Sequence, residues 1–275
     1  NLLLTFGSEQ AIRYCYELMI SPGDEVVCLN PTFAMLDVFN KTFQAKVNTV
    51  EFESPTMSVE KILEAITPAT RLVALPNPNN PTGSCFSLIE IEKLVKKCAD
   101  VGALFLSDEA YFHYNSITAQ PLIQKYDNVA VTRTFSKGWG LAGIRVGYMM
   151  AQKSVIQKLR KLKPIDEASL YSLEACLYAL KHPELLEKNV VQVHKWQKRF
   201  EELKNPELQV IPTHANFVLI KAQNKMDPIQ NWFQEHRILI KTDLGHSALK
   251  NHIRFSITDD NTMTRIYNFL SNQII

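Results

Sequence analysis

Residues 134–148 of this chain are Thr134-Phe135-Ser136-Lys137-Gly138-Trp139-Gly140-Leu141-Ala142-Gly143-Ile144-Arg145-Val146-Gly147-Tyr148. They place one lysine, Lys137, in a loop of small residues between two apolar runs, 129–132 and 146–150, that are typical of strands. We therefore expect Lys137 at a sheet edge rather than on a solvated helix. The hydroxyl of Ser136 and the guanidinium of Arg145 flank an amine that can form an imine. This pattern predicts an anion site, most simply for phosphate, beside a nucleophile.

Two other polar segments follow short apolar runs. They are Asn77-Pro78-Asn79-Asn80-Pro81-Thr82-Gly83 and Ser107-Asp108-Glu109-Ala110-Tyr111. The prolines exclude a helix or a central strand, so we expect Asn80 in a shaped loop at a strand end, where its amide is displayed or forms a turn. Asp108 follows the continuous apolar run 103–106, which suits a sheet covered on both faces, and parallel sheets place ligand sites at that end.

The four motifs, Thr-x-Ser-Lys, Gly-Ile-Arg, Asn-Pro-Asn-Asn-Pro-Thr-Gly and Ser-Asp-Glu-Ala-Tyr, together resemble the aspartate-aminotransferase superfamily of pyridoxal-phosphate enzymes (fold type I). The resemblance is closest to its histidinol-phosphate aminotransferase branch, and it runs from Gly7 to the C-terminus in the same order and spacing. It implies an α/β fold, with a three-layer α/β/α large domain around a mostly parallel sheet over residues 1–181. A small α+β C-terminal domain is expected over residues 182–275. Relatives carry several dozen residues before the equivalent of Gly7, so we expect the N-terminal part of the large domain to be absent from this sequence.

Three glycines in the first stretch also match a different motif. Gly138, Gly140 and Gly143 satisfy G-x-G-x-x-G, which is typical of nicotinamide dehydrogenases. A dinucleotide site, however, turns directly from the first strand of a βαβ unit into a helix. Here the glycines follow a loop and lead into another apolar run, which argues against a dehydrogenase.

The composition is that of a globular protein large enough for two domains. Of its 275 residues 46% are hydrophobic and 21% are charged, and the formal net charge of +2 comes from interspersed lysines and acids. No block of like charge indicates a nucleic-acid or membrane partner, and no apolar run approaches the roughly 20 residues that span a bilayer. The five cysteines lie far apart, and the seven histidines show no metal-binding spacing. We expect a cytoplasmic protein with reduced thiols and no metal.

The resemblance implies pyridoxal 5'-phosphate as the cofactor, and an amino donor and a 2-oxo acid acceptor as substrates. Lys137 would hold the cofactor and move the proton. Asp108 would pair with the ring nitrogen, although the residues alone also allow a helix N-cap or an ion pair with an arginine. Tyr111 and Asn80 would hydrogen-bond the ring oxygen. The other expected cofactor contacts are Gly7, Ser8, Glu9, Phe33, Ser136 and Arg145.

Two of these contacts, Ser8 and Phe33, also have a purely structural interpretation. Gly7-Ser8 opens an amphipathic run, and the N-terminus of such a helix is a natural phosphate seat, while Ser8 alone is also a typical N-cap. Phe33 follows Pro31-Thr32 at the start of the next predicted helix. The resemblance stacks it on the cofactor ring, whereas an aromatic residue there is more commonly part of the core.

After about residue 181 the order changes to short strands, predicted at 208–211, 217–220, 238–241 and 252–256. Arg254 alternates with Ile253 and Phe255, so it is expected to point away from their core side. The resemblance implies that it grips the substrate carboxylate, and the alternative is a solvent-facing edge arginine. In the helix predicted at 168–180 we expect the regularly spaced leucines to be core residues; these are Leu170, Leu173, Leu177 and Leu180.

The resemblance predicts a homodimer that converts histidinol phosphate and 2-oxoglutarate to imidazole acetol phosphate and glutamate, in histidine biosynthesis. Its branch usually carries arginine where this chain has Lys241, and Gly-Thr where it has Thr258-Asp259. A lysine can still hold a phosphate in the substrate site, but as a point charge. Three alternatives stay open: an aromatic amino acid aminotransferase, a phosphothreonine decarboxylase, and a non-catalytic aminotransferase-like domain of a transcription regulator. Asn80, Arg254 and Lys241 are the predicted substrate contacts.

Overall fold

The computed structural model describes residues 1–52, 57–164, 168–223 and 226–272. The larger of two sheets has the strand order β1-β7-β6-β5-β4-β2-β3. Its strands are β1 (Leu2–Thr5), β2 (Glu25–Asn30), β3 (Lys46–Glu51), β4 (Thr70–Pro76), β5 (Leu104–Asp108), β6 (Val129–Thr134) and β7 (Gly147–Ala151). The five from β3 to β6 in this order are parallel, and β7 is antiparallel to both of its neighbours. The prediction of a mostly parallel sheet is confirmed.

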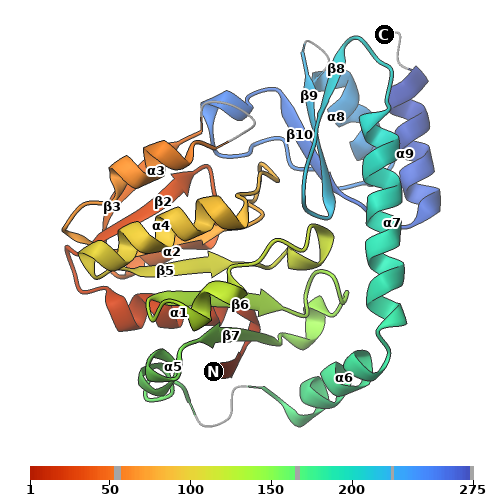
Figure 1. Ribbon diagram of the computed structural model, residues 1–275. Coiled ribbons are helices and arrows are strands. Elements are labelled where there is room, and N and C mark those ends of the chain that lie inside the picture. The colour runs from red at the N-terminus through yellow and green to blue at the C-terminus, as the bar shows by residue number, and fades with distance from the viewer. Residues whose placement is uncertain (53–56, 165–167, 224–225, 273–275) are drawn as a thin grey trace.

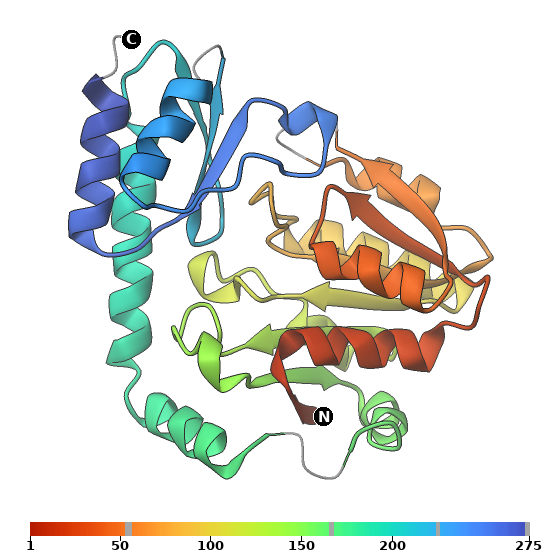
Figure 2. The same cartoon turned by 180° about the vertical axis from the view of Figure 1, so that it is seen from behind.

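Helices cover both faces of this sheet (Figures 1 and 2). On one face α1 (Gly7–Met19), α2 (Ala34–Thr42) and α5 (Lys153–Leu159) pack on one set of alternate strand residues, such as Leu72 and Ala74. On the other face α3 (Val59–Ala65) and α4 (Leu88–Val101) pack on the intervening residues, such as Val73 and Leu75. Because successive strand side chains point to opposite faces, a continuous apolar strand contributes side chains to the cores on both faces of the sheet. The result is the predicted three-layer α/β/α arrangement.

The α4 helix shows how the sequence sets element ends. The side-chain hydroxyl of Ser87 accepts from the backbone N–H of Glu90, and the Glu90 carboxylate accepts from the backbone N–H of Ser87, so the helix begins with a capping box. At its other end Gly102 has φ 74°, a left-handed conformation that ends the helix and turns the chain into β5. Both helix ends are therefore determined locally.

The smaller sheet is antiparallel, in the order β10-β9-β8, with β8 (Leu208–Ile211), β9 (Phe217–Ala222) and β10 (His252–Ser256). Its core includes side chains of α7 (Glu184–Glu201), α8 (Met226–Glu235) and α9 (Asp260–Asn272). The strand predicted at 238–241 is wrong, because only Lys241 pairs, through an isolated bridge to Arg254. Leu239 is 96% exposed, so the apolar run there does not face a core.

The two sheets are joined by α6 (Leu170–Lys181) and the long α7 (Figure 1). The division at residues 181 and 182 stays a prediction. Tyr111 and Tyr114, which follow β5, belong to the same apolar cluster as the smaller sheet. The two parts of the chain are therefore in direct contact.

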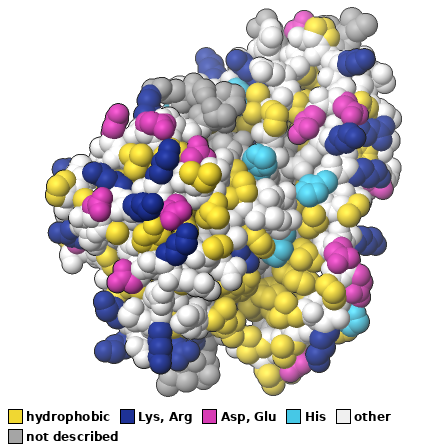
Figure 3. All heavy atoms as spheres, in the orientation of Figure 1, with side chains coloured by type: hydrophobic (Ala, Val, Ile, Leu, Met, Phe, Trp, Pro, Cys, Tyr) yellow, Lys and Arg dark blue, Asp and Glu magenta, His cyan; other side chains and the backbone are white. Residues whose placement is uncertain are grey.

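The expectation that the leucines of α6 are core residues is wrong. Leu170, Leu177 and Leu180 are 70%, 49% and 55% exposed, Leu173 is half-buried, and only Cys176 and Ala179 of this helix are buried. Helical spacing predicts an apolar stripe but not what covers it, and no described part of the chain covers this one. Figure 3 shows apolar side chains gathered toward α6 on that face of the molecule.

Two further expectations concern cysteines and membrane segments. All five cysteines are free, and four of them are buried. Among the described residues, no helix combines the length and the hydropathy that crossing a bilayer requires.

Candidate active site

A cavity of about 260 Å³ lies where β4, β5 and β6 end and α1 begins. Its lining is Ser8, Glu9, Phe33, Pro76, Asn80, Asp108, Ala110, Tyr111, Thr134, Ser136, Lys137, Ala142 and Arg145. Every predicted cofactor contact except Gly7 is among them. Gly7 lies next to the cavity, because a Cβ on Gly7 would come within 3.0 Å of Nη2 of Arg145.

The topology explains why distant motifs meet here. Asp108 is the last residue of β5, Asn80 follows the end of β4, and Lys137 follows the end of β6. Parallel strands present their carboxyl ends at one edge of the sheet, so the loops that follow them gather at that edge. Because β6 is an interior strand, Lys137 lies beyond the end of a central strand and not along an outer strand of the sheet.

Asp108 is 7% exposed as a whole residue, and its carboxyl group accepts a hydrogen bond from Oγ1 of Thr132 at 2.8 Å. Burial raises its pKa to about 6, while hydrogen bonds from Thr132 and Ser8 and the charge of Lys137 act in the opposite direction. No described arginine forms an ion pair with it, and it ends a strand rather than capping a helix. A cation in the cavity would therefore stabilise its ionised form.

Lys137 has a side chain suited to nucleophilic chemistry. Its Nζ lies 5.4 Å from the centre of the Tyr111 ring. Burial and the nearby charge of Arg254 lower the pKa of the ammonium, Asp108 opposes this, and Arg145 adds to it. A lowered pKa leaves more of the amine unprotonated near neutral pH, which favours attack on a carbonyl.

The N-terminus of α1 forms one wall of the cavity. Its N-cap residue is Phe6, which makes no side-chain capping bond, so the first backbone N–H groups keep their hydrogen-bonding capacity. The alternative that Ser8 caps this helix is excluded, because Ser8 lies within the first turn, where its hydroxyl hydrogen-bonds Asp108. Free N–H groups and the positive end of the helix dipole make this wall suitable for an anion.

Close packing holds this wall against β7. A Cβ at Gly147 would lie 2.4 Å from the carbonyl carbon of Gly7 and 2.5 Å from the backbone nitrogen of Ser8. Only glycine lets the two backbones approach in this way. Across the cavity, Oγ1 of Thr134 donates to Oγ of Ser136 at 2.9 Å, so the Ser136 hydroxyl is oriented.

The Gly138, Gly140 and Gly143 pattern leads into a short 3₁₀ turn at Ala142–Ile144 and then into β7. No α-helix follows it, so the argument against a dinucleotide-binding turn is confirmed. In the same segment Arg145 has φ 54°, a left-handed conformation that is uncommon for an arginine. Its guanidinium lies beside Gly7 at the start of α1.

The remaining predicted ring contacts line the same cavity as Lys137. Phe33 is half-buried, lines the cavity and also packs on the core of the large sheet. Its position therefore agrees with both interpretations, a contact of the cofactor ring and a core residue. Tyr111 is buried, which raises the pKa of its phenol to about 12, although the charge of Arg254 lowers it. The side-chain oxygen of Asn80 accepts a hydrogen bond from Nη1 of Arg254, so its amide nitrogen remains available as a donor.

A second cavity, of about 620 Å³, shares Phe33 and Asn80 with the first. Arg254 and Lys241 also line it, so the three predicted substrate contacts come together. Lys241 and Arg254 are directly opposite each other in an antiparallel bridge. Residues paired in this way project their side chains to the same side. Two cations therefore stand next to each other at this cavity.

Several lining residues of the second cavity were missed in the sequence, notably Asn30, Thr32, Asp37 and Asp243. Asn30 and Thr32 had a usable signal, because the apolar run 26–29 ends just before them, and such a run places its carboxyl end at the same sheet edge as Asn80. Asp37 and Asp243 had none, since they lie on a helix and in a loop.

The unusual Thr258-Asp259 has a structural role. Oδ1 of Asp259 accepts from the backbone N–H of Thr262 at 2.9 Å, and its Oδ2 accepts from the Thr262 hydroxyl at 2.8 Å, which caps α9. Asp260 accepts from Lys195 at 2.8 Å and from Nε1 of Trp196 at 2.6 Å, which ties α9 to α7. No cluster of potential metal ligands occurs in the described ranges.

Comparison with known proteins gives a consistent picture. The model of the family described as aminotransferase class I and II matches residues 1–270. A histidinol-phosphate aminotransferase of Caldanaerobacter subterraneus is 31% identical over 98% of this chain and 77% of that protein. One from Methanococcus maripaludis is 34% identical over 80% of this chain and 61% of that protein. This chain thus spans 61% to 77% of the length of these two relatives.

A solved structure shares the fold. The histidinol-phosphate aminotransferase of Sinorhizobium meliloti in complex with pyridoxal-5'-phosphate gives a TM-score of 0.87, covering 98% of this chain and 76% of that one. The two sequences are 23% identical, so this likeness speaks for the architecture.

Proposed function

The chain belongs to the class I and II aminotransferases, and from that premise we propose that it transfers the amino group of histidinol phosphate to 2-oxoglutarate. The products would be imidazole acetol phosphate and glutamate, in histidine biosynthesis. As an aminotransferase it uses pyridoxal phosphate as its cofactor. Curated relatives at 31% and 34% identity, which bear the name histidinol-phosphate aminotransferase, support the choice of substrate.

The residues around the first cavity fit this cofactor. A phosphate needs donors and positive charge, and the α1 N-terminus, the Ser136 hydroxyl and Arg145 supply them on one side. A protonated ring nitrogen needs a buried acid, and Asp108 lines the same cavity. An aldehyde needs an amine, which Lys137 carries.

When bound, pyridoxal phosphate supplies an electron-withdrawing ring that stabilises negative charge at the substrate Cα. Nζ of Lys137 would hold the cofactor covalently until the substrate amine displaces it. As a general base it would then take the proton from the substrate Cα and deliver it to the carbon of the cofactor that bears the nitrogen. The lowered pKa of Lys137 suits that role.

The neighbouring side chains would hold protons and orient the ring. Asp108 would keep a proton on the ring nitrogen. Tyr111 remains protonated because its pKa is raised, so its hydroxyl would donate to the ring oxygen together with the free amide of Asn80. Phe33 would cover one face of the ring, which positions it and keeps water away.

The observation that carries the substrate proposal is the placement of Lys241 and Arg254 at the second cavity. Two adjacent cations suit a doubly charged phosphate on the donor and a carboxylate on the acceptor. The rest of the described lining mixes polar side chains, such as Asn30 and Thr49, with aliphatic ones, and Phe33 is its aromatic residue. The two cations favour a phosphate ester over phenylalanine or tyrosine, because the side chains of those amino acids carry no phosphate.

A homodimer in the cytoplasm is part of the same proposal. The exposed apolar face of α6 supports a second copy of the chain as its cover, because monomers rarely expose large contiguous apolar patches. The five free cysteines are in keeping with a reducing compartment.

The experiment is a panel of amino donors offered with 2-oxoglutarate to the purified protein in its full natural length. Histidinol phosphate should give the highest kcat/KM. Borohydride reduction followed by peptide mapping should mark Lys137, and Lys137→Ala should lose the visible absorbance that borohydride bleaches. A label on another lysine would refute the assignment of Lys137. A higher kcat/KM for phenylalanine or tyrosine would favour an aromatic aminotransferase, and release of carbon dioxide from phosphothreonine would favour a decarboxylase.

A further inference from the structure

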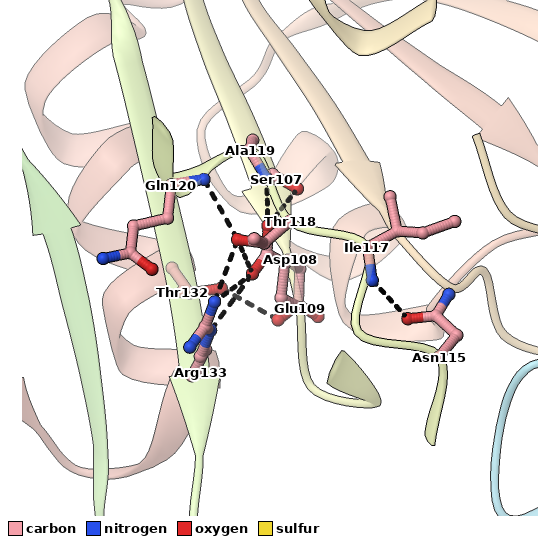
Figure 4. Close-up of polar contacts among 10 residues, drawn as sticks. All are labelled: Ser107, Asp108, Glu109, Asn115, Ile117, Thr118, Ala119, Gln120, Thr132 and Arg133. Carbon is pink, nitrogen blue, oxygen red and sulfur yellow. Dashed lines mark hydrogen bonds and ion pairs between the residues drawn. The ribbon is translucent and has the colours of Figure 1, made fainter. Parts of the chain in front are cut away.

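A buried ion pair lies directly behind the candidate active site. Arg133 on β6 and Glu109 after β5 have side chains that are 10% and 0% exposed, with Nη2 and Oε2 3.0 Å apart. Nε of Arg133 also donates to Oε2 of Glu109 at 3.1 Å. Figure 4 shows how both side chains meet beside Thr118. Arg133 follows Thr132 in the sequence and Glu109 follows Asp108, and the side chains of Thr132 and Asp108 are hydrogen-bonded to each other at the cavity.

The Glu109 carboxylate is almost completely satisfied. Oγ1 of Thr118 donates to Oε2 at 2.8 Å, and the backbone N–H of Ala119 donates to Oε1 at 2.7 Å. Nη2 of Arg133 reaches Thr118 Oγ1 at 2.9 Å, so a single network joins three separate segments. A buried charge with this many partners keeps one geometry, because any movement leaves charged groups unpaired.

The pair complements a second link across the same two strands. Thr132 and Asp108 are paired in register, and their side chains form a hydrogen bond at the cavity. Successive residues of a strand project to opposite faces, so Arg133 and Glu109 form the corresponding link on the other face. The end of β5, which carries Asp108, is therefore bound to the end of β6, which leads to Lys137, on both faces of the sheet.

Arg133 also contacts, through two aromatic residues, the loop after β6 that carries Lys137 (the lysine loop). Its guanidinium carbon lies 3.5 Å from the centre of the Phe112 ring. The next residue, His113, packs against Gly138, where a Cβ would come within 2.8 Å of the imidazole. Burial and the charge of Arg133 lower the pKa of His113 to about 4, so the ring packs there uncharged. Arg133 thus reaches the residue after Lys137 through Phe112 and His113.

We propose that Arg133 and Glu109 are positioning residues that set the distance and orientation of Asp108 relative to Lys137. This rests on the proposed function, in which the two groups act on one bound cofactor. The pair touches neither cofactor nor substrate. Without it the ends of β5 and β6 are linked on one face only, and the carboxylate and the amine lose their fixed relation.

The test compares purified holoenzymes of the parent, Arg133→Lys, Glu109→Gln and the double variant Glu109→Gln/Arg133→Met. Two quantities are measured: the pH midpoint of the visible band and kcat. Arg133→Lys keeps the charge but loses the two-pronged contact, so kcat should fall by about tenfold to a hundredfold. The midpoint should rise by roughly one pH unit, because a ring nitrogen that Asp108 holds less well no longer lowers the proton affinity of the Lys137 nitrogen.

Glu25→Gln is the matched control. Glu25 is also a buried carboxyl group, and it accepts from the hydroxyls of Thr67 and Thr70 at 2.7 Å each, but it stands at the opposite end of the sheet. The Glu25→Gln protein should melt at a lower temperature than the parent, but the pH midpoint of its visible band should be unchanged. Its kcat should stay within about twofold of the parent, a change of roughly 0.4 kcal/mol in barrier height.

The double variant separates positioning from stability. It removes both charges, so its melting temperature should return toward that of the parent. Its raised midpoint and low kcat should persist, because the link between the strand ends is still missing. If the folded Arg133 and Glu109 variants keep the parental pH midpoint and kcat, as Glu25→Gln is expected to do, the positioning role is refuted. A parent protein without a borohydride-sensitive band would instead refute the proposed function, so the two failures are distinguishable.

Discussion

Lys241 and Arg254 exchange both of their backbone hydrogen bonds, with nitrogen to oxygen distances of 2.9 and 2.8 Å. This pairing places an exposed lysine beside an arginine that also holds Asn80 at the candidate active site. The 12 residues between them include the loop that lines the second cavity with Asp243, Leu244 and Gly245. The smaller sheet therefore contributes a second charge to the cavity through one isolated bridge.

Lys241→Ala should raise KM for histidinol phosphate by an amount equivalent to roughly 1.5–3 kcal/mol, the value of one hydrogen bond to a charged group. Aromatic donors should be spared, because they carry no phosphate. Lys241→Arg is the control and should retain or improve the parental KM, since a guanidinium can bind phosphate with two donors. Arg254→Ala should instead impair the half-reaction of glutamate and 2-oxoglutarate most. Equal losses for phosphorylated and aromatic donors in Lys241→Ala would contradict a phosphate-binding role.

The buried Asp108 should make the stability of the cofactor-free protein depend on pH. Its pKa is raised to about 6 in the folded chain, so the folded state binds this proton more tightly than the unfolded state does. Its contribution is then fully present below about pH 4 and is lost as the pH rises through 6, at about 1.4 kcal/mol per pH unit, hence roughly 3 kcal/mol in total.

Urea unfolding at pH 4 and pH 7 checks this for the parent and for Asp108→Asn, both without cofactor. The difference in unfolding free energy between the two proteins should change by that amount, because other titrating groups cancel. A difference that is independent of pH would mean that Asp108 is not buried as described. With cofactor present, Asp108→Asn should still bind it but should lose transamination by several orders of magnitude.

Two glycines of the lysine loop should respond differently to the same change. A Cβ at Gly138 would lie 2.8 Å from the His113 ring, whereas a Cβ at Gly143 would meet nothing within 4 Å. Gly138→Ala should therefore displace the loop and lower kcat by about a hundredfold, as small misplacements of reacting groups can. Gly143→Ala should remain close to the parent. Steady-state kinetics of both variants provide the check, and equal behaviour would show that His113 does not confine the loop.

Charged substitutions on α6 should disrupt self-association. Leu177→Glu together with Leu180→Glu places two carboxylates on the proposed interface, and burying an unpaired charge is unfavourable. Sedimentation velocity should show the parent as a dimer and this variant largely as a monomer. Ile89→Glu is the control, because Ile89 is equally apolar and 73% exposed but lies on α4. A parent that sediments as a monomer would contradict the proposed homodimer.

Much of the candidate active site could be predicted from the sequence, because its residues lie at strand ends. Lys137, Asp108 and Asn80 each follow a short apolar run, and the parallel arrangement brings such ends to one edge. The helix ends were equally local, as the capping box of Ser87 and Glu90 shows. For Ser8 the sequence left an N-cap open beside a phosphate contact, and only the fold excluded the cap, because it places Ser8 inside the first turn of α1.

The sequence by itself therefore determined the strand-end positions of Lys137, Asp108 and Asn80, which follow from apolar runs and local turn chemistry, and its motifs implied the layered fold through their family resemblance. Only the tertiary structure decided which groups touch. The pairing of Arg133 with Glu109, the contact of His113 with Gly138 and the bridge of Lys241 to Arg254 join segments whose separation in the chain carries no pattern. The same holds for the leucines of α6, because periodicity identifies an apolar face, while burial depends on what packs against it.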